Sequence, residues 1–237
     1  MAKQSKRYRE ALKQLGADNG QKLWPLADAV ATLKKFPATK FNQTVQLAFK
    51  LGVDPKQSDQ MVRGTVALPH GSGKKVRVVV FARGAAAEAA KSAGADHVGF
   101  EDLVKKVQEG WADFDIAVAT TEAMNEVRKL GRVLGPRGLM PNPKTGTVTD
   151  DVAKAVKEVQ AGRVEFKLDK NGNVHVPCGK ISFEVDALAV NARTVIEAVS
   201  HAKPSSSKGT FIQSCTIAAT MSPGLRVDVS PILAHQA

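Results

Sequence analysis

The chain has 237 residues, 43% of them hydrophobic, and its 34 lysines and arginines outnumber 23 aspartates and glutamates to give a net charge of +11. This length allows a sizeable core in one large or two small domains, and the positive charge favours a polyanionic partner. No apolar run approaches the roughly 20 residues of a membrane-spanning helix, and no apolar segment follows the basic N-terminus as in a secretory signal. Two cysteines cannot form a disulfide framework. We therefore expect a cytoplasmic protein with reduced thiols.

The first 70 residues predict two helices followed by two strands. The helical segments span 4–15 and 25–35, and the second has a proline in its first turn. Apolar residues alternate with polar ones from Val45 to Leu51, which indicates a half-buried strand. A second strand is expected from Met61 to Leu68, before a turn rich in glycine.

Between about residues 71 and 160 the pattern changes to strands that alternate with helices. Residues 76–81 form a nearly continuous apolar run, which is typical of a strand covered on both faces. The other elements expected here are strands near 96–98 and over 114–119, and helices over 84–93, 101–109, 122–130 and 151–160. This alternation predicts βαβ units and a parallel, Rossmann-like sheet.

The segment Leu134–Val148 holds three glycines, three prolines, one arginine and one lysine, but no acidic residue. Proline fixes φ and lacks an amide hydrogen, while glycine admits φ > 0, so this segment is predicted to be neither a helix nor a central strand. Arg128, Lys129 and Arg132 come just before it. We therefore expect a stiffened loop that presents cations, as suits contact with a phosphate backbone.

After Gly162 the antiparallel pattern returns. Strands over 164–168 and 174–176 flank Asn171-Gly172, which is a strong hairpin signal. A long helix is expected over 186–201, and the last strands over 210–219 and 225–229.

These patterns together predict an α/β chain of two domains. A discontinuous α+β domain, with an antiparallel sheet plus helices, comprises 1–70 and 161–237. A Rossmann-like three-layer α/β/α domain is inserted at 71–160. Both crossings are punctuated by glycine, as hinges often are. Residues 1–69 are net +7, whereas 70–160 and 161–237 are each net +2, so the positive charge is concentrated near the N-terminal end.

Signatures of catalysis and cofactor binding are missing. The segment Gly71–Lys75 lacks the first glycine and the Ser or Thr of a Walker loop, and no G-x-G-x-x-G or G-x-S-x-G occurs. His175 and Cys178 are two potential metal ligands where zinc sites need three or four. Asp113 and Asp115 could be read as an acid/base pair, but solvated ends of a strand explain them equally well. We therefore expect no catalytic residue, no metal and no cofactor.

Two features have both a structural and a functional interpretation. Phe41, between Lys40 and Thr44 at a strand entrance, suits either core packing or contact with an unpaired base or a ribose. The segment Thr220–Gly224 is a tight turn between strands, and its residues can serve the turn alone or a ligand as well.

Several segments of this chain form a recognisable set, namely Lys40-Phe-Asn-Gln-Thr44, Ser58–Gly71, Gly110–Asp115, Leu130–Lys144, and Gly209-Thr-Phe211 with Thr220-Met221. Together they resemble large-subunit ribosomal protein L-one of bacterial type, nearly end to end. The run Gly-Pro-Arg-Gly-Leu-Met-Pro-Asn-Pro-Lys144 is the most specific part of the match. The resemblance implies two domains, the second inserted in the first, and a non-catalytic constituent of the large ribosomal subunit.

In function, the resemblance implies binding to the mobile stalk of 23S rRNA beside the exit site. It further implies assistance in the release of deacylated tRNA and repression of translation from the protein's own operon mRNA. The expected partners are thus the rRNA stalk, exit-site tRNA, the protein's own mRNA leader and the large subunit, with no membrane. Off the ribosome the protein is expected to be a monomer.

The resemblance also implies which residues contact RNA. Lysines pair with phosphates, Phe41 and Met221 pack on ribose or base, and hydroxyls bond to 2′-OH groups. The residues carried over as rRNA-binding are Lys40, Phe41, Thr44, Lys167, Ser214, Thr220 and Met221. Arg132, Arg137 and Lys144 of the inserted domain are carried over as additional rRNA or tRNA contacts.

One position departs from the family pattern, in which Thr-Met is followed by glycine. Here Ser222 follows Met221. If that glycine provides φ > 0 or a close approach to RNA, the serine costs on the order of 1 kcal/mol. Either the turn tolerates serine, or Gly224 takes over the bend.

Two other classes of function compete with rRNA binding. An enzyme acting on nucleotides or RNA is favoured only by the Rossmann-like section, and the missing phosphate loop, metal set and nucleophile–base pair oppose it. An interaction module without nucleic acid conflicts with the net charge of +9 on residues 1–69 and 161–237 together.

Overall fold

The chain divides into two compact units. Our computed structural model describes residues 4–16 and 22–234, apart from the side chains of Ser58 and Lys144. Unit 1 is made of Met1–Gly73 and Val164–Ala237, and unit 2 of Lys74–Arg163. The predicted crossings, at 70/71 and 160/161, lie three residues before these boundaries. The mixture of helices and parallel and antiparallel strands confirms the predicted α/β class.

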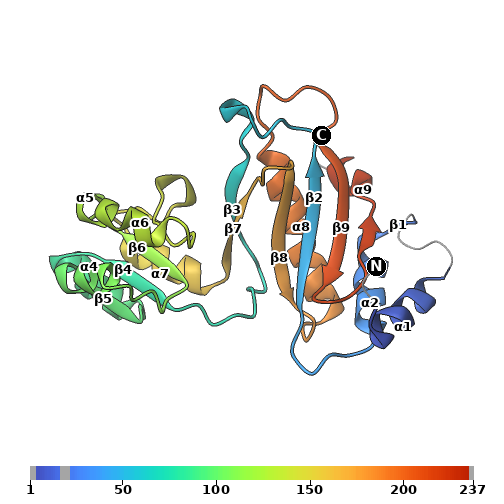
Figure 1. Ribbon diagram of the computed structural model, residues 1–237, viewed down its shortest axis with the longest axis horizontal. Helices are drawn as coiled ribbons and strands as arrows, with labels where there is room; N and C mark the ends of the chain where they lie inside the picture. Colours follow the sequence, from blue (N-terminus) through green and yellow to red (C-terminus); the bar gives the residue numbers. More distant parts are fainter. Residues whose placement is uncertain (1–3, 17–21, 235–237) are drawn as a thin grey trace. The chain divides into compact units, whose positions relative to one another are not determined.

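Unit 1 is built on a five-stranded sheet (Figure 1). Its strand order is β1-β10-β9-β2-β8, with β1 parallel to β10 and the other neighbours antiparallel. A further two-stranded sheet pairs β3 with β7. The elements of this unit are α1 (Lys6–Leu15), β1 (Leu23–Trp24), α2 (Leu26–Lys35), β2 (Thr44–Leu51), the 3-10 helix η1 (Ser58–Gln60), β3 (Arg63–Ala67), β7 (Arg163–Lys167), β8 (Asn173–Lys180), α8 (Val185–His201), β9 (Ile212–Ala219), β10 (Leu225–Val227) and α9 (Ser230–Ala234).

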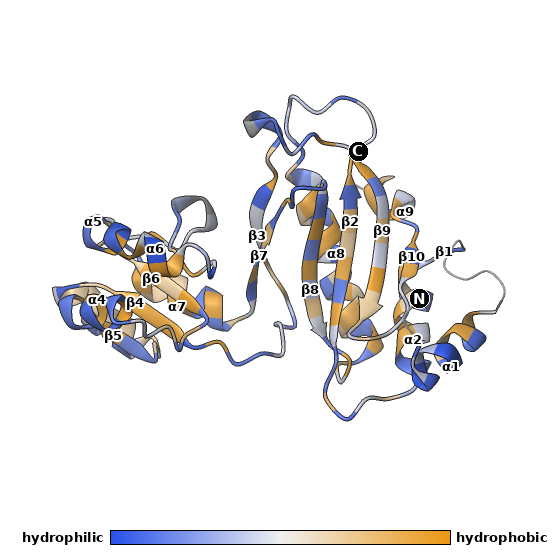
Figure 2. Ribbon diagram, in the orientation of Figure 1, coloured by the Kyte–Doolittle hydropathy of each residue, from blue (hydrophilic) through white to orange (hydrophobic). Residues whose placement is uncertain are grey.

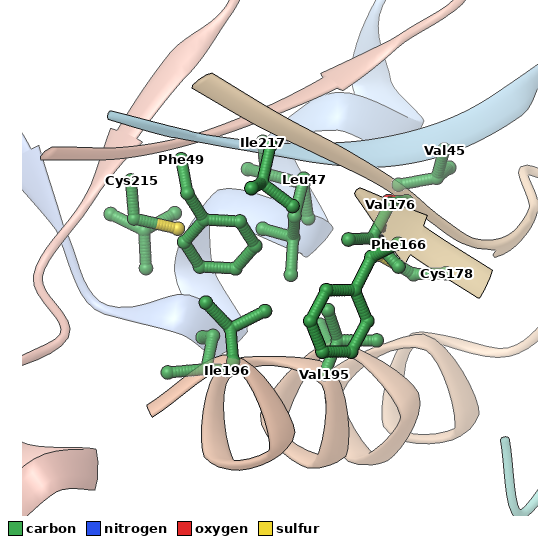
Figure 3. Close-up of a cluster of buried hydrophobic side chains, with 14 of the residues drawn as sticks. Val45, Leu47, Phe49, Phe166, Val176, Cys178, Val195, Ile196, Cys215 and Ile217 are labelled. Atoms are coloured by element: carbon green, nitrogen blue, oxygen red, sulfur yellow. Dashed lines mark hydrogen bonds between the residues drawn. The ribbon is translucent and has the colours of Figure 1, made fainter. Parts of the chain in front are cut away.

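The core of unit 1 lies between the sheet and its helices. Alternate residues of β2 are fully buried, as the period of two in the sequence predicts. Figure 3 shows Leu47, Phe49 and Ile217 of the sheet above Val195 and Ile196 of α8. Each of these five side chains is at most 1% exposed, so burial of this face supplies most of the stability of the unit.

The predicted hairpin around Asn171-Gly172 is present at its tip, but it does not extend into a strand pair. The turn itself is present, with Gly172 at φ 76°. Beyond the turn, β7 pairs with β3 and β8 pairs along its length with β2, so the two flanking strands belong to different sheets. They are joined next to the turn by the antiparallel bridge Leu168↔Val174 and by the hydrogen bond from the Asp169 N–H to the Asn173 carbonyl (2.8 Å). Burial decides this, because β8 gains a long ladder and a buried face against β2.

Unit 2 has three layers around a parallel sheet of order β5-β4-β6. On one face Val79 and Phe81 pack with α4, and on the other Val78 and Val80 pack with α3 and α7. The hydrophobic colour of β4 in Figure 2 corresponds to this double burial. The elements are β4 (Val78–Phe81), α3 (Gly84–Ser92), β5 (His97–Gly99), α4 (Glu101–Gln108), β6 (Ile116–Ala119), α5 (Met124–Val127), η2 (Arg128–Leu130), α6 (Gly131–Leu134), η3 (Pro143–Thr145) and α7 (Val152–Gln160).

The helix predicted over 122–130 is wrong in form. Three short pieces, α5, η2 and α6, replace it and extend to Leu134. Leu130 and Leu134 are fully buried against the sheet, and the tighter 3-10 turn between the α-helical pieces keeps both in the core. Beyond Leu134 the segment up to Val148 is irregular except for η3 and a parallel bridge from Val148 to Ala119, in agreement with its glycine and proline content.

Local signals at other positions are reproduced, and two short elements were missed. The side chain of Asp151 accepts a hydrogen bond from the Lys154 N–H (3.2 Å) and caps the N-terminus of α7, the helix predicted over 151–160. The strand β1 and the helix α9 were not predicted, because they are only two and five residues long. Among the described residues no helix is long and apolar enough to span a membrane.

Candidate nucleic-acid interface

The five-stranded sheet of unit 1 has one face packed on helices and one face exposed to solvent. The exposed face carries the side chains that alternate with the core residues, among them Gln46 and Lys50 of β2. The sheet register sets Lys50 opposite Ser214 and Ala48 opposite Thr216. We call this surface the open face. It presents amides, hydroxyls and a cation, which are groups that bond phosphates and 2′-OH groups.

At one end of the open face the first residue of β2 and the segment after β9 are linked by hydrogen bonds. The Thr44 N–H donates to Thr220 Oγ1 (3.2 Å), and the Thr220 N–H donates to the Thr44 carbonyl (3.0 Å). Gln43 Nε2 donates to the Thr220 carbonyl (2.7 Å), and Lys180 Nζ of β8 donates to Thr44 Oγ1 (2.8 Å). Two predicted site residues, Thr44 and Thr220, are thus in direct contact although 176 residues separate them.

Two large apolar side chains lie at this same end without being buried. Phe41 is 49% exposed and Met221 is 65% exposed. The core-packing interpretation of Phe41 is therefore wrong. The Thr39 hydroxyl donates to the Phe41 carbonyl (2.6 Å) and holds the backbone that carries the ring. We call Phe41, Thr44, Lys180, Thr220 and Met221 the sheet-end cluster, and it combines apolar surface, hydroxyls and a cation.

Met221 has an unusual backbone conformation. Its φ is 64°, and it is the sole non-glycine residue with positive φ in the described part of the chain. A residue with a Cβ pays roughly 1–2 kcal/mol to adopt this left-handed conformation. Strained residues with exposed side chains are concentrated at functional sites. Arg7 Nη2 of α1 lies 3.8 Å from Met221 Sδ, which brings a second cation to the cluster.

The turn after β9 accommodates Ser222 without strain. The Ser222 N–H donates to the Ala219 carbonyl (2.9 Å), and its hydroxyl accepts from the Ala219 N–H (3.0 Å) and donates to the Pro223 carbonyl (3.1 Å). Positive φ occurs at Met221, whereas neither Ser222 nor Gly224 has it. Of the two alternatives left open by the sequence, the turn therefore tolerates serine.

The other predicted residues of unit 1 are less closely grouped. Lys40 is exposed beside Phe41. Ser214 is half-buried on the open face opposite Lys50, six residues along β2 from Thr44, or about 20 Å. Lys167 is exposed at the end of β7, outside the five-stranded sheet, where it lines a hollow of about 500 Å³. Lys167 is therefore not part of the sheet-end cluster.

The predicted residues of unit 2 lie in or beside the segment rich in glycine and proline. Arg132 on α6 and Arg137 after it are exposed, and neither has a hydrogen-bond or ion-pair partner in the part of the chain that the structure describes. Lys144 lies in η3, and its side chain is outside what the structure describes. Two exposed guanidinium groups are therefore available to an anionic partner.

Neither cysteine is suited to chemistry. Both are buried in the core of unit 1, and this burial raises the pKa of each thiol to about 12. Neutral thiols are poor nucleophiles and poor metal ligands. Among the described residues no three His, Cys, Asp or Glu side chains are grouped so that they could hold a metal ion.

Three residues of this region were missed by the sequence analysis, namely Arg7, Gln43 and Lys180. Alternation in the strand predicted at 174–176 misleads about Lys180, because a strict period of two would place it on the core face with Val174 and Val176. The register shift between Val45 and Gln46 of the neighbouring strand sets Lys180 opposite Thr44 instead. Arg7 and Gln43 carry no periodic signal, since their contacts depend on how distant segments come together.

One comparison with known protein families bears on this interface. Residues 33–223 match the sequence model of the ribosomal protein L1p/L10e family. The match covers most of the chain and includes β2, β8 and β9, which carry most of the open face.

Proposed function

The chain belongs to the ribosomal protein L1p/L10e family, and from this premise we propose that its sheet-end cluster and open face bind the mobile stalk of 23S rRNA. Family membership makes it an rRNA-binding protein of the large subunit on the cytoplasmic ribosome and not an enzyme. What we propose beyond family membership is the stalk as the binding site on 23S rRNA and the individual residues that contact it.

The observation that carries this proposal is the pairing of exposed apolar groups with hydroxyls and cations at one strand end. Phe41 and Met221 offer surfaces for a ribose or an unpaired base, while Thr44 and Thr220 offer hydroxyls to 2′-OH groups. Lys40 and Lys180 supply charge for phosphates. Hydrogen bonds between backbone and side-chain groups fix the two threonines before RNA arrives, which lowers the entropic cost of binding.

Further along the open face, Ser214 is proposed to make a second hydroxyl contact and Lys167 a phosphate contact from the neighbouring sheet. Contacts about 20 Å apart match a folded RNA rather than one nucleotide. Selectivity would then depend on RNA shape, because single-stranded and helical parts must both fit.

Unit 2 is proposed to act on tRNA. Arg132, Arg137 and Lys144 would contact rRNA or exit-site tRNA and help deacylated tRNA leave the ribosome. We also propose that the same unit 1 surface binds the leader of the protein's own operon mRNA and represses its translation. One surface can serve both RNAs if the leader reproduces the shape of the stalk.

The deciding experiment measures binding of the full chain to a stalk RNA fragment and to an unrelated duplex of equal length, across a salt series. We expect selective binding to the stalk with a modest salt slope. Phe41→Ala should weaken stalk binding by roughly 1–3 kcal/mol, the scale of one aromatic–base contact. Leu23→Ala is the matched control, since Leu23 is 60% exposed on the far edge of the same sheet.

Equal binding to both RNAs that collapses with salt would contradict the proposal, because a basic surface alone behaves that way. An unchanged affinity of Phe41→Ala, with a native circular dichroism spectrum, would remove the cluster from the binding site.

A further inference from the structure

Unit 2 contains a hollow that the proposed rRNA contacts do not use. Its volume is about 580 Å³, and its lining includes Arg83 just after β4, Phe100 just after β5 and Glu122 soon after β6. All three parallel strands thus contribute at their carboxyl ends. In open α/β sheets, ligands bind in the crevice at this edge, and the volume is within the range of small-molecule sites.

One wall of the hollow is a flat, fixed guanidinium group. Arg83 Cζ lies 3.8 Å from the centre of the Phe100 ring, and Arg83 Nη2 is 2.6 Å from Glu101 Oε1. The ring supports one face of the guanidinium and the carboxylate fixes its rotation. The Arg83 side chain remains 62% exposed, so its other face is available. A planar aromatic ligand can stack on such a surface.

The remaining lining offers polar groups with spare bonding capacity. The side chains of Lys105, Gln108, Glu122 and Asn125 make no hydrogen bond or ion pair to any other residue that the structure describes. Amides both donate and accept, which suits the edge of a heterocyclic base.

Charge in the lining argues against a phosphate ligand. Three cations, Arg83, Lys105 and Lys129, are balanced by three carboxylates, those of Glu101, Glu122 and Glu126. Such a balanced lining gives a polyanion no net attraction, whereas a neutral ring with several donors and acceptors suits it.

We propose that this hollow binds an unstacked nucleobase, which stacks on the Arg83 guanidinium and is bonded along its edge by Asn125 and Gln108. The site lies in unit 2, and the proposal stands independently of the rRNA contacts of unit 1. The base can belong to a free nucleoside or to an unpaired position of an RNA loop, since both present the same ring.

The test is nuclear magnetic resonance titration of the ¹⁵N-labelled full chain with adenosine, guanosine, cytidine and uridine in turn. At least one nucleoside should shift the amide signals of Arg83, Phe100 and Asn125. Arg83→Lys, which keeps the charge but removes the plane, should weaken that binding about fivefold or more, the lower end for one stacked base. Asn125→Ala should weaken it as well.

Lys91→Ala on α3 is the control, because Lys91 is exposed and lies outside the lining, and it should bind like the original chain. A hairpin RNA whose loop holds the same base distinguishes the two sources. If the hairpin shifts these amide signals and binds more tightly than the nucleoside does, the base belongs to RNA. If the two bind equally, the ligand is a free nucleoside. The proposal is overturned if no nucleoside shifts these signals, if Arg83→Lys binds normally with a native spectrum, or if free glutamine produces the shifts and nucleosides do not.

Discussion

Replacing Met221 by glycine should make the protein more stable and a weaker RNA binder at once. Met221 has φ 64°, which costs a residue with a Cβ roughly 1–2 kcal/mol, and glycine removes that cost. Glycine also makes the unfolded chain more flexible, which lowers the free energy of unfolding by about 0.5–1 kcal/mol. Because the side chain is 65% exposed, little burial is lost. Relative to Met221→Ala, which retains the strain, we expect Met221→Gly to be more stable by about 0.5–1 kcal/mol.

The effect on binding should be the same for both variants. If RNA covers the exposed two thirds of this side chain, the contact contributes about 1–2 kcal/mol, from the roughly 1.5–3 kcal/mol of a fully buried side chain. Both variants should therefore bind the stalk fragment roughly 5- to 30-fold more weakly than the original chain.

The assay can follow unit 1 by itself. The chain has two tryptophans, Trp24 in unit 1 and Trp111 in unit 2, so urea unfolding in a Trp111→Phe background reports on unit 1 through Trp24. Equal stability of the glycine and alanine variants would refute the argument from backbone strain. Native affinity in both would show that RNA does not contact Met221.

Three further predictions concern burial and charge. Asn191 is fully buried and bonds the His70 N–H and the carbonyls of Gly71 and Cys178, so Asn191→Ala should lower the free energy of unfolding by about 2–4 kcal/mol in urea, with exposed Asn125→Ala unchanged. The pKa of each cysteine is raised to about 12, so a thiol reagent at pH 8 should label neither cysteine before denaturation. The free energy of unfolding should fall above about pH 9, because thiols ionise there in the unfolded chain but not in the folded one. Fast labelling of the folded protein would contradict the buried, neutral state of both thiols. Arg137→Ala should leave stalk affinity nearly intact but slow tRNA release on assembled ribosomes, and an equal loss of both would place unit 2 in the primary site.

Much of the fold was predictable because local patterns record which faces are buried. The apolar run at 76–81 became β4, covered on both faces, and the alternation from Val45 to Leu51 became β2, with one face in the core. The helix pieces between Met124 and Leu134 were not predictable, since their form depends on packing against the sheet. The residues of the site came mainly from a family resemblance, because the period of two marks which side chains of a strand are exposed but not which of them bind RNA.

By itself, the sequence predicted the α/β class, the strand β4 that is covered on both faces, and the irregular form of the segment after Leu134 with its exposed Arg137. Only the tertiary structure decided that Thr44 contacts Thr220, that Phe41 is exposed, and that strain resides at Met221 rather than Ser222. The reason is physical: the period of a strand fixes which side chains are buried, but several pairings bury the same residues equally well. The pairing chosen, β9 with β2 rather than β7 with β8, depends on the whole core, and it alone brings the distant parts of the interface together.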